Sequence, residues 1–236
     1  MKVLRILPIL AVAVAIAIAA SGFGARFGVW DFRVGFQVLR WGTYAGLAVA
    51  ACALVALLVP ATRAGRARPL ALALVVASGA AALPMYWMYT ARALPSINDI
   101  TTDTDNPPLF VAVVPLRASA PVPSSYAGDA TARAQHAGYP DLKPLIVARP
   151  PAAAFETALA TARQMGWDIV AADATAGRIE ATTITPWFGF HDDIVIRVAP
   201  ADPGSRIDIR SVSRVGRGDL GVNARRIREF LARYAA

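Results

Sequence analysis

Cysteine and histidine are nearly absent from this sequence. Its one cysteine, Cys52, lies inside a long apolar run, and its two histidines are His136 and His191. A single cysteine excludes a disulfide within the chain and a metal site built on several cysteines. The histidines also lack the HxH and HExxH spacings of common metal sites. The sequence therefore predicts no metal site and no cofactor.

Two motifs typical of enzymes are missing as well. No GxSxG is present, so a nucleophile elbow is not predicted. The glycines of Gly216–Gly218 lack the third glycine of a dinucleotide-binding GxGxxG motif, and no parallel βαβ pattern precedes them. The run His191-Asp192-Asp193 has the residue types for acid/base or metal chemistry, but we interpret it as turn and cap residues. No catalytic residue is predicted.

Acidic residues are scarce in the first 91 residues, which hold eight Lys and Arg but only one acid, Asp31, for a net charge of +7. The remaining residues hold 16 basic and 15 acidic side chains, for a net charge of +1. The overall charge of +8 thus belongs to the apolar part of the chain, where Lys and Arg flank membrane helices. Because a nucleic-acid-binding protein concentrates its positive charge on the soluble domain, no nucleic-acid partner is predicted.

Long apolar runs make up most of the N-terminal part. We predict a membrane domain at 1–95 with three transmembrane helices at about 3–20, 42–59 and 69–89, because each run is long enough to cross a bilayer of about 30 Å. The connection 22–41 is predicted to lie along the membrane interface. Small residues at the end of the first run leave its cleavage as a signal peptide open.

Basic residues near the apolar runs predict the orientation. With the N-terminus inside, the cytoplasmic side holds Lys2, Arg5, Arg63, Arg66 and Arg68, and the other side holds Arg26, Arg33, Arg40 and Arg92. Because Lys and Arg favour the cytoplasmic side, we predict a multi-pass protein of the cell inner (plasma) membrane whose C-terminal domain is extracytoplasmic. The high Ala and Arg content is typical of a bacterial protein, here one of the cell envelope.

The soluble part is predicted to begin with an extended linker and surface excursion at 96–143, in which Asp103 and Asp105 are interpreted as turn residues rather than calcium ligands. An α+β core follows at 144–236. Apolar periodicity predicts strands at about 145–148, 167–171, 178–184, 194–198 and 206–213, and helices at about 151–165 and 219–234. The predicted fold is three transmembrane helices followed by a C-terminal two-layer α+β domain of antiparallel sheet with helices packed on one face.

Alternation along the strands assigns side chains to two faces of the sheet. The apolar face is expected to form the core under the helices, with Ile179, Ala181, Ile194, Ile196, Val198, Ile207 and Ile209. The opposite face collects Arg178, Glu180, Thr182, Asp193, Val195, Arg197, Arg206, Asp208 and Arg210. For this second face we favour solvated ion pairs over a binding surface for a polar partner.

Two further segments are candidate contacts. The connection 186–190 carries Trp187, Phe188 and Phe190, which either wedge beneath the 117–143 excursion or project toward a partner protein or the bilayer surface. A glycine-rich turn flanked by Arg214 and Arg217 precedes the last helix, where backbone N–H groups attract anions. The candidate ligand-binding residues around it are Arg210, Ser213, Arg214, Gly216, Asp219, Asn223 and Arg226.

The soluble part resembles the domain of unknown function 1499 family in three segments: ITTDTDNPPLF at 100–110, ITPWFGFHDDIVIRV at 184–198 and IDIRSVSRVGRGDLGVNARRI at 207–227. The last segment is the most specific, with Arg-Ser-x-Ser-Arg-x-Gly followed by Asp, Gly, Asn and Arg-Ile. The resemblance covers roughly 97–235. It implies an uncharacterised domain, and no catalytic role comes with it.

Two functions of different classes agree with these features. We favour a non-enzymatic membrane protein of uncharacterised function, anchored in the lipid bilayer, whose extracytoplasmic domain binds an envelope protein, a lipid or an anionic small ligand. The alternative is a membrane-associated, hydrolase-like enzyme that uses Asp192, Asp193 and His191 together with Asp219. That alternative requires the four side chains to converge in one pocket.

Overall fold

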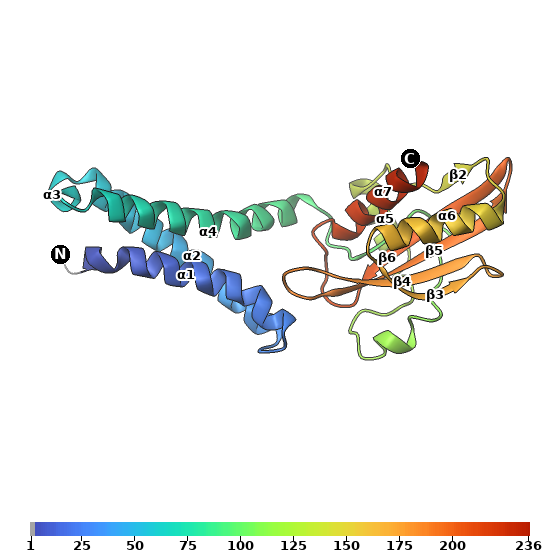
Figure 1. Ribbon diagram of the computed structural model, residues 1–236, viewed down its shortest axis with the longest axis horizontal. Helices are drawn as coiled ribbons and strands as arrows, with labels where there is room; N and C mark the ends of the chain where they lie inside the picture. Colours follow the sequence, from blue (N-terminus) through green and yellow to red (C-terminus); the bar gives the residue numbers. More distant parts are fainter. Residues whose placement is uncertain (1–2) are drawn as a thin grey trace. The chain divides into compact units, whose positions relative to one another are not determined.

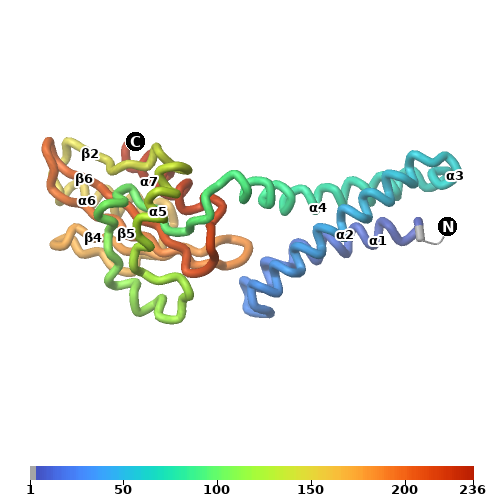
Figure 2. The backbone as a smooth tube through the Cα atoms, turned by 180° about the vertical axis from the view of Figure 1, so that it is seen from behind, coloured from blue at the N-terminus to red at the C-terminus, as the bar shows by residue number. Residues whose placement is uncertain are grey.

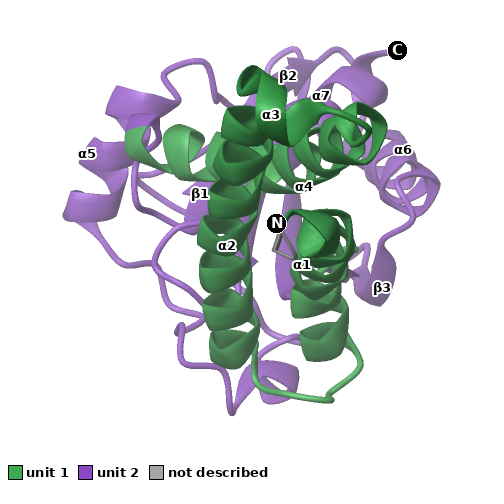
Figure 3. Ribbon diagram, turned by 90° about the vertical axis from the view of Figure 1, so that its left-hand side faces the viewer, with its two compact units in different colours: residues 1–92, 186–189 green, residues 93–185, 190–236 purple. Residues whose placement is uncertain are grey.

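The computed structural model of the chain describes residues 3–236, so Lys2 of the charge argument lies outside the described residues. Contacts between residues divide the chain into two compact units, which have different colours in Figure 3. The first comprises residues 1–92 and 186–189, and the second comprises residues 93–185 and 190–236. The first unit therefore holds the apolar runs, and the second holds the sequence of mixed polarity.

Apolar helices form the first unit. They are α1 (Val3–Arg26), α2 (Phe32–Leu58), the one-turn α3 (Pro60–Arg63) and α4 (Ala67–Ala93). As predicted, three of them, α1, α2 and α4, are apolar and long enough to cross a membrane. The connection predicted at 22–41 is shorter than expected, because all but residues 27–31 belong to α1 or α2. Its place along the membrane interface stays a prediction. Asp31 caps α2 by accepting a hydrogen bond of 2.8 Å from the backbone N–H of Arg33.

Small residues are buried between the helices of this first unit. On α2 and α4 they are Gly46, Ala50, Ala53, Ala73, Ala77 and Ala81. A Cβ atom added at Gly46 would lie 3.4 Å from the carbonyl oxygen of Ala77, so glycine allows α2 and α4 to approach closely. Membrane helices associate through this kind of packing, since lipid removes the hydrophobic drive between them.

The second unit is an α+β domain (Figure 1). Its strands are β1 (Asp99–Thr101), β2 (Leu145–Val147), β3 (Asp168–Asp173), β4 (Arg178–Ile184), β5 (His191–Ala201) and β6 (Gly204–Ser213). Its helices are η1 (Pro115–Arg117), α5 (Asp129–Gly138), α6 (Pro151–Gln164) and α7 (Val222–Ala235). All strand pairs are antiparallel in the order β1-β6-β5-β4-β3, with β2 paired to β6 beside β1. The predicted antiparallel sheet with helices is confirmed.

One face of the sheet packs against α6 and α7. Five isoleucines on β4, β5 and β6 have at most 1% of their surface exposed: Ile179, Ile194, Ile196, Ile207 and Ile209. They form a single cluster with the apolar side of the two helices, including Phe155 and Phe230. The apolar face predicted from strand alternation is therefore the core of the domain.

The opposite face is covered by the segment 102–126. In Figure 1 α6 lies in front of the sheet, and in Figure 2, from behind, this segment crosses in front of it. Phe110 and Val113 anchor the segment on Val195 and Val212 of the sheet. The prediction of a solvated charged face is wrong, because the charged side chains at its centre have no exposed surface: Glu180, Asp193, Asp208 and Arg210.

Besides the short η1, two elements within 96–143 were not predicted, β1 and α5. They are joined through Gln135 of α5, whose side chain is buried against Thr101 of β1. The strand has only three residues and the helix contains glycine and few large apolar residues, so neither has a clear periodic pattern.

Candidate functional site

Glu180 on β4 binds the segment that covers the charged face. Its carboxylate accepts hydrogen bonds of 3.0–3.1 Å from the backbone N–H groups of Val111, Ala112 and Val113. Arg178 donates another at 3.0 Å. Successive N–H groups that converge on an anion form a stable nest. Both oxygens of Glu180 are thus held by the protein itself.

Arg210 on β6 is the largest fully buried side chain of the domain. Its guanidinium donates two hydrogen bonds of 2.8 Å to the carboxylate of Asp99, and it also bonds the carbonyl oxygens of Pro108 and Ser124. Burial raises the pKa of Asp99, and the paired Arg210 opposes that rise. Burial beside Asp99 also raises the pKa of Tyr126 to about 12. The predicted ligand-binding role of Arg210 is not supported, because its donors point to protein acceptors.

Asp193 on β5 forms the centre of a second buried group. Arg214 donates to its two oxygens at 2.8 and 2.9 Å, and Thr182 donates at 2.8 Å. Arg117 adds an ion pair at 3.2 Å. Burial lowers the pKa of Arg117, and Asp193 acts against this effect. Arg214, a predicted ligand-binding residue, therefore turns away from the glycine-rich turn and neutralises a buried carboxylate.

Asp103 has the turn role predicted for it. Its Oδ1 accepts hydrogen bonds from the backbone N–H groups of Asp105 and Asn106 at 3.2 and 2.9 Å. Its Oδ2 pairs with Arg197 and Arg206 at 3.0 and 2.6 Å. The turn thereby joins the covering segment to the end of the charged face.

Asp192 points to the other face of β5, where it meets α7. Arg226 donates to its carboxylate at 2.6 Å and to the hydroxyl of Ser211 at 2.8 Å. Asn223 bonds the hydroxyls of Ser211 and Ser213 at 2.7 and 3.0 Å. Three predicted ligand-binding residues, Ser213, Asn223 and Arg226, thus form a polar network that joins α7 to the sheet.

Asp219 occupies the N-terminus of α7. Its carboxylate accepts hydrogen bonds from the backbone N–H groups of Gly221 at 2.9 Å and Asn223 at 2.6 Å. Burial raises the pKa of Asp219, and these two hydrogen bonds oppose the rise. Gly216 contributes its carbonyl oxygen to the side chain of Asn98. The N–H groups predicted to bind an anion are therefore already bonded to a carboxylate of the protein.

The residues of the enzymatic alternative do not converge. Asp192 pairs with Arg226 and Asp193 with Arg214, on opposite faces of β5, because neighbouring strand residues alternate. The Nδ1 atom of His191 is buried without a hydrogen-bond partner, and burial followed by Arg214 lowers the pKa of its imidazole. Across residues 3–236 no group of three or more His, Cys, Asp or Glu side chains is placed to hold a metal ion.

The aromatic residues of 186–190 are divided between the units. Trp187 and Phe188 belong to the first unit, where the indole N–H of Trp187 donates to the carbonyl oxygen of Ala19 at 2.9 Å. The ring of Phe188 lies 4.8 Å from that of Phe36. Phe190 belongs to the second unit, and its backbone N–H bonds the hydroxyl of Thr185 at 2.8 Å. Trp187 and Phe188 thus contact the chain's own helices, and their contact with a partner or the bilayer surface stays a prediction.

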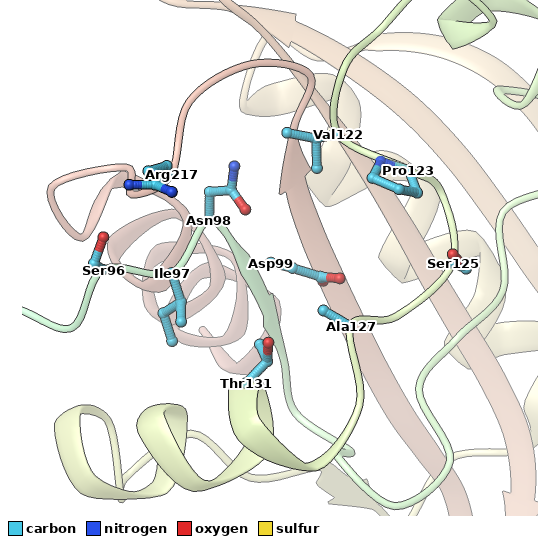
Figure 4. Close-up of a pocket in the computed structure, with 10 residues that line it drawn as sticks. All are labelled: Ser96, Ile97, Asn98, Asp99, Val122, Pro123, Ser125, Ala127, Thr131 and Arg217. Atoms are coloured by element: carbon cyan, nitrogen blue, oxygen red, sulfur yellow. The ribbon is translucent and has the colours of Figure 1, made fainter.

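A pocket of about 200 Å³ lies in the second unit (Figure 4). Its walls come from the backbone stretch Ser96–Asp99, from the loop 122–127, from Thr131 at the start of α5 and from Arg217 in the glycine-rich turn. Figure 4 shows Arg217 on the side of Asn98, with Val122 and Pro123 across from it. The sequence identified Arg217 only as a flank of the turn, because the pocket joins three segments that are far apart in the chain.

Arg217 differs in its pairing from the arginines near it in the sequence. Arg210, Arg214 and Arg226 each pair with a buried carboxylate, whereas Arg217 is exposed and forms no hydrogen bond or ion pair within residues 3–236. A guanidinium offers several donors in a planar fork that matches carboxylate and phosphate groups. The pocket therefore has a cation available for an anionic group from outside the protein.

Comparison with known proteins agrees with the sequence resemblance. A family model described as "Protein of unknown function (DUF1499)" matches residues 99–233, from β1 to near the end of α7. No curated protein matches the chain at a significant level. Because the match covers more than half of the chain, the protein belongs to the DUF1499 family, with three apolar helices before the family domain.

Proposed function

We propose that this protein is a membrane-anchored binding protein whose α+β domain holds a small anionic ligand in the pocket at Arg217. The observation that carries the proposal is an unpaired guanidinium in the wall of a pocket, whereas the nearby Arg210, Arg214 and Arg226 are neutralised internally. Since those three arginines are paired with carboxylates of the protein, the positive charge that attracts an anionic ligand comes from Arg217.

Rigidity of the pocket walls supports binding. Asn98 lies between the sheet and the turn: its side chain donates to the carbonyl oxygen of Gly216, and its own carbonyl oxygen accepts from Ser213 and Asn223. The loop 122–127 is held from below, where Arg210 bonds the carbonyl oxygen of Ser124. A site whose walls are already ordered loses little conformational entropy when a ligand binds.

The proposal places the domain outside the cytoplasm, in the cell envelope, with the helices in the inner membrane. The support is the cluster of Arg63, Arg66 and Arg68, which runs from the end of α3 to the first turn of α4, because positive charge at a short connection favours the cytoplasmic side. With this connection in the cytoplasm, α4 crosses the membrane to the outside, and the α+β domain follows it in the sequence.

The test of this function measures anion binding by the full-length protein in detergent micelles. Acetate and inorganic phosphate are titrated, and their NMR line widths report exchange with the protein. We expect broadening that Arg217→Ala removes and that Arg225→Ala, an exposed arginine of α7 outside the pocket, leaves intact. Equal broadening for wild type and Arg217→Ala with both anions would overturn the proposal.

A further inference from the structure

The outer edge of β1 has one open hydrogen-bonding position, at Asp99. Bonds from Ser213 to Asn98 and from Thr102 to Ile209 show that even-numbered residues face β6. Because backbone groups alternate in an antiparallel pair, the N–H and C=O of Asp99 point away from β6. No loop or side chain within residues 3–236 bonds to either group.

The next position along the same edge is already closed. The side-chain amide of Gln135 donates to the carbonyl oxygen of Thr101 at 2.6 Å and accepts from its N–H at 2.9 Å. A carboxamide that makes both bonds takes the place of the backbone N–H and C=O of one residue in a neighbouring strand. At Thr101 the edge of β1 thus binds an amide of the protein itself. The backbone N–H and C=O of Asp99 face the same way, and Asp99 lies in the pocket wall.

We propose that the pocket binds the free carboxyl-terminal end of an extended peptide. A peptide N–H and C=O pair with Asp99, as in the addition of a strand to a sheet edge, and the terminal carboxylate pairs with Arg217. This inference rests on the proposed function and specifies its ligand. Gln135 limits the addition to a short stretch, because it blocks the edge beyond Asp99.

The charge of Asp99 does not oppose this ligand. Its two carboxylate oxygens each receive a hydrogen bond of 2.8 Å from Arg210, so the pair adds little net charge to the pocket. Arg217 is then the charge that a terminal carboxylate meets. A bidentate pair between guanidinium and carboxylate is directional, and it sets which end of the peptide enters.

The pocket walls favour small side chains in the ligand. Ser96, Ser125, Ala127 and Thr131 line it, and its volume of about 200 Å³ is small. Residues of the size of alanine fit such walls, whereas aromatic residues require displacement of the loop 122–127. N-acetyl-Ala-Ala with a free carboxylate is therefore the matched probe.

The experiment measures binding of N-acetyl-Ala-Ala to the full-length protein in detergent micelles by saturation-transfer NMR and titration. Two altered probes separate the contacts: the carboxyl-terminal amide removes the charge, and methylation of the amide nitrogen of the first alanine removes the donor for Asp99. We expect each change to weaken binding at least tenfold. Arg217→Ala is expected to weaken binding of the free acid to the same extent, with Arg225→Ala as the control.

A second pair of variants tests whether the peptide binds inside the pocket, by filling the pocket with a large side chain. Ala127→Phe fills the pocket, and Ala130→Phe places the same ring at an exposed position of α5 outside its wall. Only Ala127→Phe is expected to abolish binding. If acetate contacts Arg217 but the peptide and its N-methylated form bind no tighter than acetate, the peptide inference fails while the anion site stands. If no probe responds to Arg217→Ala, both fail.

Discussion

At the scale of single residues, the charged face of the sheet depends on carboxylates that are solvated by the protein instead of by water. Glu180 has no exposed surface, yet three backbone N–H groups and Arg178 surround it. Removing a charged acceptor from such a site leaves donors unsatisfied, and this loss is larger than the net value of the bonds. Individual residues of this face should therefore be sensitive to small chemical changes.

Glu180→Gln tests this sensitivity. The amide turns an NH2 group toward the N–H groups of residues 111–113, so we expect a loss of about 2–4 kcal/mol in the free energy of unfolding and faster proteolysis of the segment 102–126. Chemical denaturation and limited proteolysis of the full-length protein measure both. Glu156→Gln on the exposed side of α6 is the control. Equal stability of the two variants would contradict the role of the nest.

His191 should make stability depend on pH. Burial and Arg214 lower the pKa of its imidazole in the folded protein, whereas the unfolded value is about 6.5. The folded state then binds fewer protons, so stability is complete above about pH 6.5 and decreases as the pH falls toward the folded pKa. We expect the melting temperature of the wild type to fall more between pH 7.5 and 5.5 than that of His191→Gln. Parallel curves would contradict the prediction.

The sequence predicted which charged residues share a face, but it did not predict that the face is buried. Alternation along β4, β5 and β6 places Glu180, Asp193 and Arg210 on the side opposite the isoleucines. Burial depends on residues 102–126, which lie about 70 residues before Glu180 and have no periodic pattern. The candidate site was predicted only in part for the same reason. The sequence located the arginine-rich segment, but pairing with carboxylates from distant segments decides which arginine remains available for a ligand.

At the scale of elements, the sequence predicted the middle of each membrane helix better than its ends. The apolar runs located α1, α2 and α4, but each helix extends beyond its run: α1 and α2 through Gly, Arg and aromatic residues, and α4 through Ala, Thr and Arg. Backbone hydrogen bonds continue through these residues until a cap is reached, and α2 begins after its N-cap Asp31. An apolar run predicts only the part of a helix that lipid can cover, and this part is shorter than the whole helix.

The contact of α2 with α4 gives a matched pair of glycine substitutions. A Cβ atom at Gly46 meets Val14 at 3.3 Å and the carbonyl oxygen of Ala77 at 3.4 Å, whereas one at Gly79 meets nothing within 4 Å. We expect Gly46→Val to separate the helices and lower stability by about 1–3 kcal/mol through overpacking. Gly79→Val should have little effect. Thermal unfolding in the same detergent compares them, and similar melting temperatures would contradict the packing described here.

At the scale of the whole molecule, the chain combines an apolar unit with a nearly neutral domain. Net charge in the soluble part is only +1, and most of its charged side chains on the sheet are paired and buried. Such a domain has no extended field to attract a large polyanion. A single unpaired arginine in a pocket is the local exception, which favours small ligands over macromolecular polyanions.

The orientation of the whole chain is the last prediction, and it determines which ligands reach the pocket. Arg63 ends α3, Arg66 follows it and Arg68 lies in the first turn of α4. This charge should hold the connection of α2 to α4 in the cytoplasm. A phosphatase reporter that is active only outside the cytoplasm, fused after Ala236, is therefore expected to be active. Replacing the three arginines with asparagine should reduce that activity, while Arg225→Asn should not. An inactive phosphatase fusion together with an active cytoplasmic reporter at the same position would place the pocket among cytoplasmic ligands and contradict an envelope function.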